Sequence, residues 1–493
     1  MLATEPKKFL VNGEWRCGKG ETFESLNPAD GTLAGIVYSA TPEDVDDAVR
    51  GGLSVAESAE WRSVPAHKRA AMLHRFADLI DRDRDILCRL QARDNGKTVK
   101  EGYIHVDMAI EKFRYCAALC ETLESTVIPP RGNWLSYKTY EPMGVVGSMT
   151  AFNSPILHEA GKIAPAIAAG NAVVLKSSEF TPLIGLEYGR LALEAGFPAG
   201  LLNVVTGGAE VGAALVNHPR LSMIAFTGGT STGRIVGHAA AERIIPCILE
   251  LGGKSPNIVF EDAKMDHALT GMLYGIFSNA GQSCIAGSRI FVQASIYDEF
   301  VPKLVEATKA LKVGSPEDPA TAVAPVASFR QRDVIERFIE MGKADPAATL
   351  LCGGGRPDDP TLANGAYIMP TLFAVSDHRC AIAQEEIFGP VGVVIRFENE
   401  EDLVEKANDT VFGLSLGIWT EDYRKAMRTA RAIKAGTVWV NTHKIGQPSM
   451  PMGGFKESGI GRENGIDGIL EYLQIKNTYW NLSESPIAWP PKA

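Results

Sequence analysis

The sequence has few cysteines and no paired cysteine motif. Among 493 residues there are 8 cysteines, and none of them forms a CxxC pair. Cys116 and Cys120 are separated by the spacing of one helical turn, inside FRYCAALCE. This distribution argues against a zinc site and against a disulfide framework, and it favours reduced thiols in a cytoplasm.

Basic runs and long apolar runs are also absent. The formal net charge is -10, without the clustered Lys and Arg that phosphate backbones attract, which argues against a nucleic-acid partner. The longest weakly polar stretch, 164–175, has 12 residues and is too short to span a bilayer. Residues 1–20 carry no apolar run after their lysines, so no secretory signal is expected. We therefore expect a cytoplasmic protein without a membrane partner.

The length and the hydrophobic patterning indicate a multidomain α/β protein. A chain of 493 residues favours two or three domains. Residues 62–120 have helical periodicity, and 135–148 alternate like strands, which suggests a hairpin-like excursion. Short apolar strands then alternate with helices over 172–251 and again over 266–440, which predicts two parallel sheets covered by helices. A ligand would meet the loops at the carboxyl ends of the strands.

Several short motifs each have both a structural and a functional interpretation. FTGGTSTGR at 226–234 lies between a strand and a helix, so it is either a tight turn or a phosphate-binding turn, although it is neither a P-loop nor GxGxxG. Glu250 ends an apolar strand, as a partly solvated residue or as a base with a raised pKa that faces a cleft. Asn153 either caps a turn before Pro155 or donates to an oxyanion.

Two further residues are equally ambiguous when taken alone. Cys284, in NAGQSCIAGSR, is either a small core residue or a nucleophile. Glu386, in EEIFGP, either caps the approach to a strand or takes part in a site.

Taken together, the motifs resemble the aldehyde dehydrogenase superfamily, of the NAD(P)-dependent, hydrolytic type. Glu250 and Cys284 stand 34 residues apart, in the order typical of that family, and the resemblance covers essentially the whole chain. The motifs that carry it are AFNSP (151–155), VVLKSSE (173–179), FTGGTSTG (226–233), ELGGKSP (250–256), GQSC (281–284), EEIFGP (385–390) and GGFKESGIGRE (453–463).

The resemblance implies oxidation of an aldehyde to a carboxylic acid through a thiohemiacetal and a thioester. It identifies Cys284 as the nucleophile, Asn153 with the Cys284 N–H as the oxyanion hole, and Glu250 as the general base. It also assigns Lys162 and Glu463 to a proton relay behind that base. Because Cys284 stands in a flexible loop of small residues near a helix end, we expect a lowered thiol pKa.

The cofactor that the resemblance implies is NAD. In it, Lys176 and Glu179 hold the adenosine ribose, 228–233 the pyrophosphate, and Glu386 with Phe388 the nicotinamide end. A carboxylate at Glu179 favours NAD over NADP, because it repels a 2'-phosphate. The full set implied is Phe152, Lys176, Glu179, Gly208, Gly212, Phe226, Thr227, Gly228, Gly229, Thr232, Gly233, Leu251, Glu386 and Phe388.

Three positions depart from the family pattern beside the expected dinucleotide. Ala151 and Phe152 replace a Pro-Trp pair, Ser177 replaces a proline, and Gly229 replaces a serine. None of these changes removes a catalytic group, but each puts the affinity and pose of the cofactor in question.

The family places the substrate tunnel between the helix after Asn153 and the loop before GGFK. Because Gly161 and Gly446 occupy places where many relatives carry aromatics, we expect a wider, slightly more polar tunnel and a preference for bulky or polar-substituted aldehydes. Alternatively, neighbours such as Met452 refill the space. The lining residues implied are Ser154, His158, Gly161, Ile285, Gly446 and Met452, and no metal is implied.

The family fold predicts two Rossmann-like parallel-sheet domains and a small oligomerisation strand pair. The unpaired edges of that strand pair need a partner subunit, so a homodimer or homotetramer is expected. The expected division is 1–123 with 143–252 for the dinucleotide domain, 253–457 for the catalytic domain, and 124–142 with 458–493 for the oligomerisation segments and the C-terminal return.

Two other functions compete with this interpretation. In a CoA-acylating relative a thiol replaces water as the acyl acceptor, and such members usually lack the base carboxylate that Glu250 supplies here. In a non-catalytic structural protein of the same fold the catalytic set has no role, so the intact Cys284, Glu250 and Asn153 argue against it. Assays of NADH formation with and without CoA separate the three.

Overall fold

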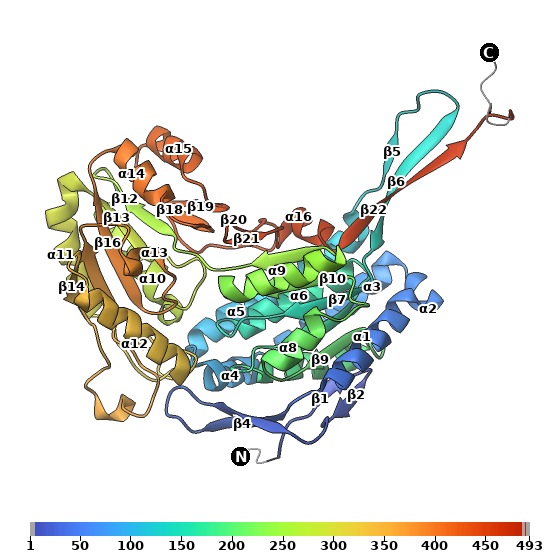
Figure 1. The fold of residues 1–493 in the computed structure, drawn as a ribbon, viewed down its shortest axis with the longest axis horizontal. Helices are drawn as coiled ribbons and strands as arrows, with labels where there is room; N and C mark the ends of the chain where they lie inside the picture. Colours follow the sequence, from blue (N-terminus) through green and yellow to red (C-terminus); the bar gives the residue numbers. More distant parts are fainter. Residues whose placement is uncertain (1–4, 486–488, 490–493) are drawn as a thin grey trace.

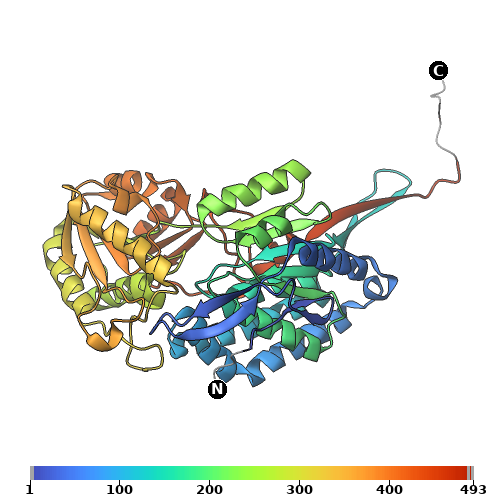
Figure 2. The ribbon, with the colours of Figure 1, turned by 60° about the horizontal axis from the view of Figure 1, so that its bottom comes forward.

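The computed structural model describes residues 5–485 and residue 489. Two α/β bodies lie side by side, and an arm of long strands extends from one of them (Figure 1). Turned by 60°, the molecule still shows the arm projecting away from both bodies (Figure 2).

The first body is built on an eight-stranded sheet. Its five central strands, β9, β8, β7, β10 and β11, run parallel. They are almost entirely buried and have few polar residues, as expected for a parallel sheet with helices on both faces. In spatial order the strands are β2 (Glu14–Arg16), β1 (Phe9–Val11), β9 (Leu202–Val205), β8 (Ala172–Lys176), β7 (Val145–Met149), β10 (Met223–Thr227), β11 (Cys247–Glu250) and β21 (Gly459–Ile460).

The second body contains a seven-stranded sheet, parallel except for one antiparallel edge strand, β14. In spatial order the strands are β14 (Ala348–Cys352), β15 (Thr371–Val375), β16 (Val391–Phe397), β13 (Arg289–Gln293), β12 (Pro256–Val259), β18 (Ser415–Trp419) and β19 (Thr437–Val440). After β19 the chain returns to the first body, where β21 pairs antiparallel with β11.

Helices cover the sheets, and two of the longer ones begin with a capping box. Thr41 caps α1 and Thr98 caps α5, each through a reciprocal bond with an acidic residue three positions later. The helices of the first body are α1 (Pro42–Glu57), α2 (Ala59–Arg62), α3 (Ala66–Arg82), α4 (Arg84–Asn95), α5 (Val99–Thr122), α6 (Pro155–Ala168), α7 (Leu183–Ala195), α8 (Ala209–Val216) and α9 (Thr230–Arg243). Those that follow are α10 (Met265–Phe277), α11 (Tyr297–Lys309), α12 (Phe329–Ala344), α13 (Ala381–Gln384), α14 (Glu400–Asn408), α15 (Tyr423–Ala432) and α16 (Gly465–Leu470).

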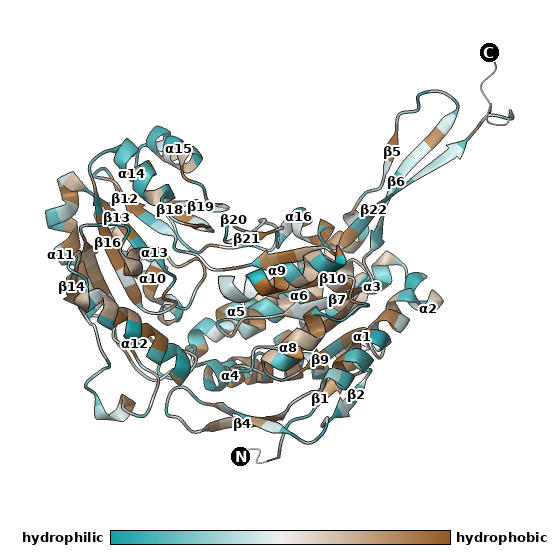
Figure 3. Cartoon of the chain, in the orientation of Figure 1, coloured by the Kyte–Doolittle hydropathy of each residue, from teal (hydrophilic) through white to brown (hydrophobic). Residues whose placement is uncertain are grey.

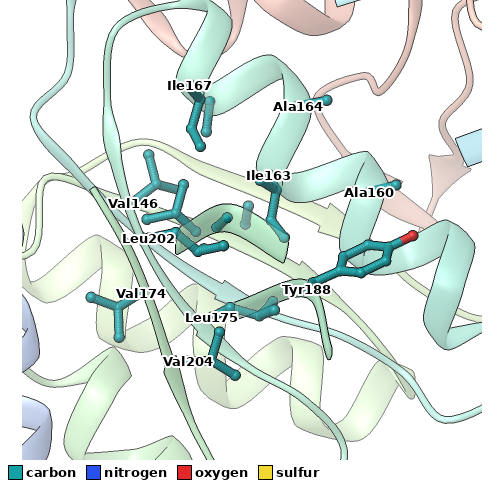
Figure 4. Close-up of a cluster of buried hydrophobic side chains, with 14 of the residues drawn as sticks. Val146, Ala160, Ile163, Ala164, Ile167, Val174, Leu175, Tyr188, Leu202 and Val204 are labelled. Atoms are coloured by element: carbon teal, nitrogen blue, oxygen red, sulfur yellow. The ribbon is translucent and has the colours of Figure 1, made fainter. Parts of the chain in front are cut away.

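Helix α6 is anchored on the first sheet by apolar side chains. Ile163 and Ile167 point from α6 toward Val146 on β7 (Figure 4). Tyr188 on α7 adds a hydrogen bond of 2.8 Å from its hydroxyl to the carbonyl of Ile156. Full burial of each such aliphatic side chain stabilises the fold by about 1.5–3 kcal/mol relative to exposure. The helix that carries the predicted relay lysine is therefore fixed against the sheet.

The arm is a three-stranded antiparallel sheet in the order β22, β6, β5. Its strands are β5 (Thr126–Ile128), β6 (Trp134–Pro142) and β22 (Leu473–Asn481). Hydrophobic residues recur along this sheet although it projects into solvent (Figure 3). Its exposed large hydrophobic residues are Val127, Ile128, Trp134, Leu135, Ile475, Tyr479 and Trp480.

The expected hairpin at 135–148 is wrong in its pairing. β6 pairs with β5 and β22, whereas β7 leaves the arm and enters the centre of the eight-stranded sheet. Gly144, with φ of 128°, separates the two strands and turns the chain between the sheets. Two smaller antiparallel pairs complete the strands, β3 (Thr22–Leu26) with β4 (Leu33–Tyr38) and β17 (Phe412–Gly413) with β20 (Phe455–Lys456).

Within the described ranges, no helix combines the length and apolar character needed to cross a bilayer.

Candidate active site

A cavity of about 600 Å³ lies at the carboxyl ends of the parallel strands of the first sheet. Its walls include the residues that directly follow β7, β8, β9, β10 and β11, which is where ligands of open α/β sheets bind. The second body contributes Cys284, Gln331, Glu386 and Phe388 to the lining. The volume lies within the roughly 300–1,000 Å³ typical of small-molecule and cofactor sites.

Thirteen of the fourteen residues that the resemblance implies for the cofactor line this cavity. The exception is Gly233, where an added Cβ would clash with Leu251, so this glycine serves the packing of α9 against the end of β11. A Cβ at Gly208 or Gly229 would meet nothing within 4 Å. Gly229 is the N-cap of α9, so the free N–H groups of that helix start beside the open space, as phosphate binding requires.

The departure at Ser177 has a different consequence from the one expected. Ser177 is buried and does not line the cavity. Its hydroxyl donates to Oε1 of buried Glu159 at 2.6 Å. Burial raises the pKa of Glu159 well above its usual value. The change from proline therefore serves an internal hydrogen bond and does not remove a contact beside the dinucleotide.

Lys176 and Glu179, which were expected at the adenosine end of the cofactor, form an ion pair of 3.6 Å. Burial lowers the pKa of Lys176, while the carboxylate of Glu179 opposes that effect. At the other end, Glu386 accepts a 3.0 Å hydrogen bond from the Gly253 N–H, and burial raises its pKa to about 7. Phe388 packs edge-on against Phe152, with ring centroids 5.6 Å apart.

Cys284 follows α10 and a short 3₁₀ turn, Ser278–Gly281, whose last three residues all have positive φ. Hydrogen bonds fix this loop. The Asn279 amide donates to the carbonyls of Asn153 and Gln282, at 3.1 and 2.7 Å. Gln282 in turn accepts from the Ala327 N–H at 2.9 Å. The expectation of a flexible loop is therefore wrong.

The expected lowering of the Cys284 pKa is also wrong for the protein without ligands. Burial, and then the nearby carboxylates of Glu250 and Glu386, raise the pKa of this thiol to about 12. The 3₁₀ turn does not offset this, because its backbone is left-handed and presents no aligned helix terminus. Deprotonation of Cys284 therefore requires a base or an incoming positive charge.

Glu250 is the last residue of β11 and is buried. Neither of its carboxylate oxygens has a hydrogen-bond partner among the described residues. Burial, and then the negative charge of Glu463, raise its pKa to about 8, against the opposing charge of Lys162. A carboxylate without partners and with a pKa near neutrality is suited to accept a proton.

Behind Glu250, Lys162 on α6 forms a buried ion pair with Glu463. Burial alone would raise the pKa of Glu463, but the charges of Lys162 and Lys112 hold it below its usual value. The backbones of Glu463 and Met452 exchange two hydrogen bonds, of 2.7 and 2.8 Å. Met452 is therefore held in a backbone bridge beside this ion pair.

Asn153 lies at the start of α6 with its side chain in the cavity wall. Its Nδ2 donates to the Gln282 carbonyl at 3.0 Å, which leaves one N–H of the amide for another acceptor. Nε2 of His158 lies 3.1 Å from Asn153 Oδ1. Because Oδ1 only accepts, the imidazole is the donor, and it orients the amide. Burial lowers the pKa of His158 to about 3, so the ring is neutral.

Of the predicted substrate residues, His158 lines the cavity, and the other five do not. Ser154 is buried as the N-cap of α6, and the carbonyl of Ile285 accepts from His443 at 3.2 Å. The space above Gly161 is taken by Lys112, whose Nζ would lie 3.0 Å from an added Cβ. A Cβ at Gly446 would lie 3.8 Å from the Cε of Met108.

The residues of α5 that face this region were not predicted from the sequence. The spacing of Glu101, His105, Met108 and Lys112 could have indicated them, because it puts all four on one face of a helix. Lys254 is buried, and its Nζ has no partner among the described residues. Lys254 lies inside the ELGGKSP motif, but no role was predicted for it.

The comparisons with known proteins agree with this geometry. The family model described as "Aldehyde dehydrogenase family" matches residues 15–478. An aldehyde dehydrogenase of Aspergillus niger is 42% identical over 98% of this chain and 96% of its own length. Human aldehyde dehydrogenase 1A1 is 40% identical over 98% of this chain and 96% of its own.

Solved structures agree as well. The NAD⁺ complex of an aldehyde dehydrogenase from Bacillus cereus has a TM-score of 0.94 at 38% identity, covering 97% of each chain. Betaine aldehyde dehydrogenase from Staphylococcus aureus in complex with NAD⁺ has a TM-score of 0.97 at 37% identity, covering 100% of this chain and 98% of that one. The chain belongs to the aldehyde dehydrogenase family, and the predicted family and fold class are confirmed.

Proposed function

We propose that this protein oxidises an aldehyde to the carboxylic acid with NAD as hydride acceptor, using Cys284 as the nucleophile. The observation that carries the proposal is the convergence of Cys284, Glu250 and Asn153 on one cavity of dinucleotide size. The family supports the reaction, and the structures of relatives in complex with NAD⁺ support the cofactor.

The residues that would hold the dinucleotide are those of the cavity wall. Lys176 and Glu179 would bind the adenosine ribose, the N-terminus of α9 the pyrophosphate, and Glu386 with Phe388 the nicotinamide end. When bound, NAD accepts the hydride that leaves the substrate carbon.

The first chemical step is proton removal from Cys284. Burial and the nearby carboxylates raise the pKa of the thiol to about 12, and the positive charge of a bound nicotinamide ring would favour the thiolate. The thiolate attacks the aldehyde carbon and forms a thiohemiacetal. Its oxygen accepts hydrogen bonds from the Asn153 amide and the Cys284 N–H, which stabilise the developing charge. Loss of hydride leaves a thioester on Cys284.

The second step is hydrolysis of that thioester. Glu250 takes a proton from water, and the hydroxide adds to the thioester carbon, so that the acid leaves and the sulfur is released. Lys162 and Glu463 would then carry the proton away from Glu250, because their ion pair lies behind that carboxylate. The reaction consumes one aldehyde, one NAD⁺ and one water, and yields one acid, one NADH and one proton.

The CoA-acylating alternative is not supported. Glu250 stands in the cavity as a carboxylate without partners, which suits deacylation by water. The test is NADH formation with a panel of aldehydes, with and without CoA. We expect NADH and free acid without CoA, and no acyl-CoA when it is added.

We further propose a homodimer or homotetramer that assembles through the arm. The strands β5 and β22 stand at its edges, and its exposed apolar residues favour a protein partner. We also propose a cytoplasmic location, which is supported by the eight free cysteines and by a relative from Macroscelides proboscideus named "Aldehyde dehydrogenase, cytosolic 1". For the domains we keep the division at 252/253 and 457/458, with 124–142 as a separate arm segment.

A further inference from the structure

Basic side chains from three parts of the chain, His158 among them, lie near the loop that carries Cys284. Lys97 precedes α5, His105 and Lys112 lie on α5, His158 lies on α6, and Lys444 follows β19. We refer to these five residues as the basic cluster, in which burial lowers the pKa of both histidines and leaves the three lysines as its cations. None of them belongs to the motifs that mark the family, and the reaction proposed above uses none of their charges.

One face of α5 presents part of this cluster to the substrate side of the site. Helix α5 packs on α6, and Lys112 Nζ occupies the space above Gly161. One turn earlier on the same face, Met108 faces Gly446. Gly161 and Gly446, two of the positions that the resemblance places beside the substrate, therefore both face this side of α5.

Lys444 approaches the nucleophile loop from the other side. Its Nζ donates to Ser278 Oγ at 2.8 Å and lies 5.8 Å from the centre of the Tyr274 ring. Its backbone is left-handed, with φ of 59°, a conformation that a residue other than glycine adopts at a cost. Ser278 begins the turn that leads to Cys284, so Lys444 is bonded to the start of that turn, and its charge interacts with the Cys284 thiol.

The cations of this cluster have too few anions. Among the described residues, no carboxylate lies within 4 Å of the ammonium groups of Lys97, Lys112 or Lys444, and Lys97 Nζ makes no hydrogen bond to any of them. Lys97 is nevertheless only 3% exposed. Nδ1 of His105 is buried and also without a partner.

Glu101 is the nearest compensating carboxylate, and its oxygens are already engaged. They accept from the Asn279 N–H at 2.7 Å and from the Thr98 hydroxyl at 2.8 Å. Burial lowers the pKa of Lys97 to about 8 and that of Lys444 to about 7, with the charge of Glu101 opposing the effect at both. A buried ammonium without a counter-ion is costly, and an anionic ligand relieves that cost.

We infer that the substrate is an aldehyde with an anionic oxygen group, a carboxylate or a phosphate, at the end away from its carbonyl, and that Lys97 and Lys444 hold that group. This inference rests on the proposed oxidation at Cys284. A neutral aldehyde leaves the ammonium groups without a partner, and a cationic aldehyde is repelled by them.

The test compares aldehydes of matched length. The kcat/KM of the holoenzyme is measured for 5-oxopentanoate and pentanal, and for glyceraldehyde 3-phosphate and glyceraldehyde, which separates carboxylate from phosphate recognition. We expect kcat/KM to be about tenfold or more higher for the anionic member of one pair than for its neutral partner. In Lys444→Gln we expect this ratio of kcat/KM values to fall by about ten- to hundredfold, which is the effect of losing a hydrogen bond to a charged group. Lys444→Arg should restore most of it. Lys303→Gln, which removes an exposed lysine of α11, should leave both values unchanged.

Equal kcat/KM values for the members of both pairs, or an anion preference that survives Lys444→Gln, would overturn the inference. Calorimetry on Cys284→Ala keeps this failure apart from failure of the proposed reaction. If no aldehyde is oxidised but glutarate binds more tightly than pentanoate and Lys444→Gln removes the difference, the cluster binds anions and the proposed reaction is wrong. If pentanal is oxidised but glutarate binds no better than pentanoate, and no anionic aldehyde is preferred, the reaction stands and the anion site does not.

Discussion

The two sides of Cys284 differ in how their charges are balanced. On the cofactor side, Lys176 is paired with Glu179, and Glu386 accepts from a backbone N–H. On the substrate side, the ammonium groups of Lys97 and Lys444 stand without a carboxylate within 4 Å among the described residues. On the cofactor side, the charges of Lys176 and Glu179, the pair proposed to bind the ribose, already balance each other. On the substrate side, these ammonium groups lack a counter-ion until an anionic ligand binds.

This difference indicates which part of the molecule sets the substrate specificity. The cofactor side is built from turns at the ends of parallel strands, whose glycines leave room for any dinucleotide of the same shape. The substrate side is built from helix faces and one loop, where single side chains change the charge without disturbing the backbone. The same reaction can therefore be directed to a different aldehyde by substitutions such as those at Lys444 and Lys112.

The largest effect is expected from Cys284→Ala, which removes the atom shared by both sides. Without the sulfur no covalent adduct forms, so NADH production should fall to the background rate while NAD still binds. Stopped-flow measurement of NADH, with circular dichroism to check folding, tests this. Turnover above a few per cent of the wild type in a folded protein would assign the nucleophile elsewhere.

Glu250→Gln should have the next largest effect. An amide cannot accept a proton, so steady turnover should slow by about 10²–10⁴, the usual contribution of a general base. A first burst of NADH should remain, because Cys284 can still be acylated and only water activation is lost. Equal losses in burst and steady rate would mean that Glu250 is needed before hydride transfer, and would contradict its assignment to water activation.

The two sides should respond to pH with opposite signs. Burial raises the pKa of Glu250 to about 8, and its base form accumulates above that pH, so kcat for a neutral aldehyde should rise about tenfold per unit below pH 8 and then level. Burial lowers the pKa of Lys97 to about 8 and that of Lys444 to about 7, and only their protonated forms attract an anion, so the preference for the anionic aldehyde should fall from pH 6.5 to 9.

Profiles of kcat and of the preference over pH 6 to 9.5, with Glu250→Gln and Lys444→Gln as references, check both slopes. A preference that rises with pH would contradict the cationic assignment. The charged and titratable groups that interact with Lys97 and Lys444 from the surrounding elements are Glu101, His105, His158, Tyr274 and Cys284.

A smaller effect is expected at the adenosine end. Glu179→Gln removes the charge that would repel a 2'-phosphate and frees Lys176 from its ion pair, so the ratio of kcat/KM for NAD over NADP should fall by about tenfold. Glu187→Gln, on α7 and outside the cavity wall, serves as a control for loss of one carboxylate. An unchanged ratio would show that Glu179 does not set the choice of cofactor.

The sequence predicted the fold class correctly, and most of the residues expected to bind the cofactor line one cavity, for physical reasons. Alternating strands and helices predict parallel sheets, and the residues after parallel strands meet at one edge, so motifs such as 226–234 could be placed from local order alone. The hairpin error at 135–148 arose because strand periodicity does not reveal which sheet a strand joins. β7 is as apolar as the other central strands, and its pairing with β8 and β10 is a matter of tertiary structure.

The ionisation of the site could not be predicted in the same way. The raised pKa of Cys284 depends on burial and on Glu250 and Glu386, which come from distant parts of the chain. Lys112 and Gly161 are 49 positions apart in the sequence, so the chain alone did not show that a lysine fills the space that the glycine leaves. The six substrate positions were inferred from the family resemblance, and that resemblance does not specify the charged residues that surround them in this chain.

The most direct test of the central claim is to find where the acyl group is carried. Glu250→Gln protein is mixed with NAD and a good aldehyde substrate, quenched in acid, digested and analysed by mass spectrometry. We predict an acyl thioester on the peptide that contains Cys284, and on no peptide that contains any of the other seven cysteines. A stable acyl group on another residue, or a burst of NADH with no acyl group on Cys284, would contradict it.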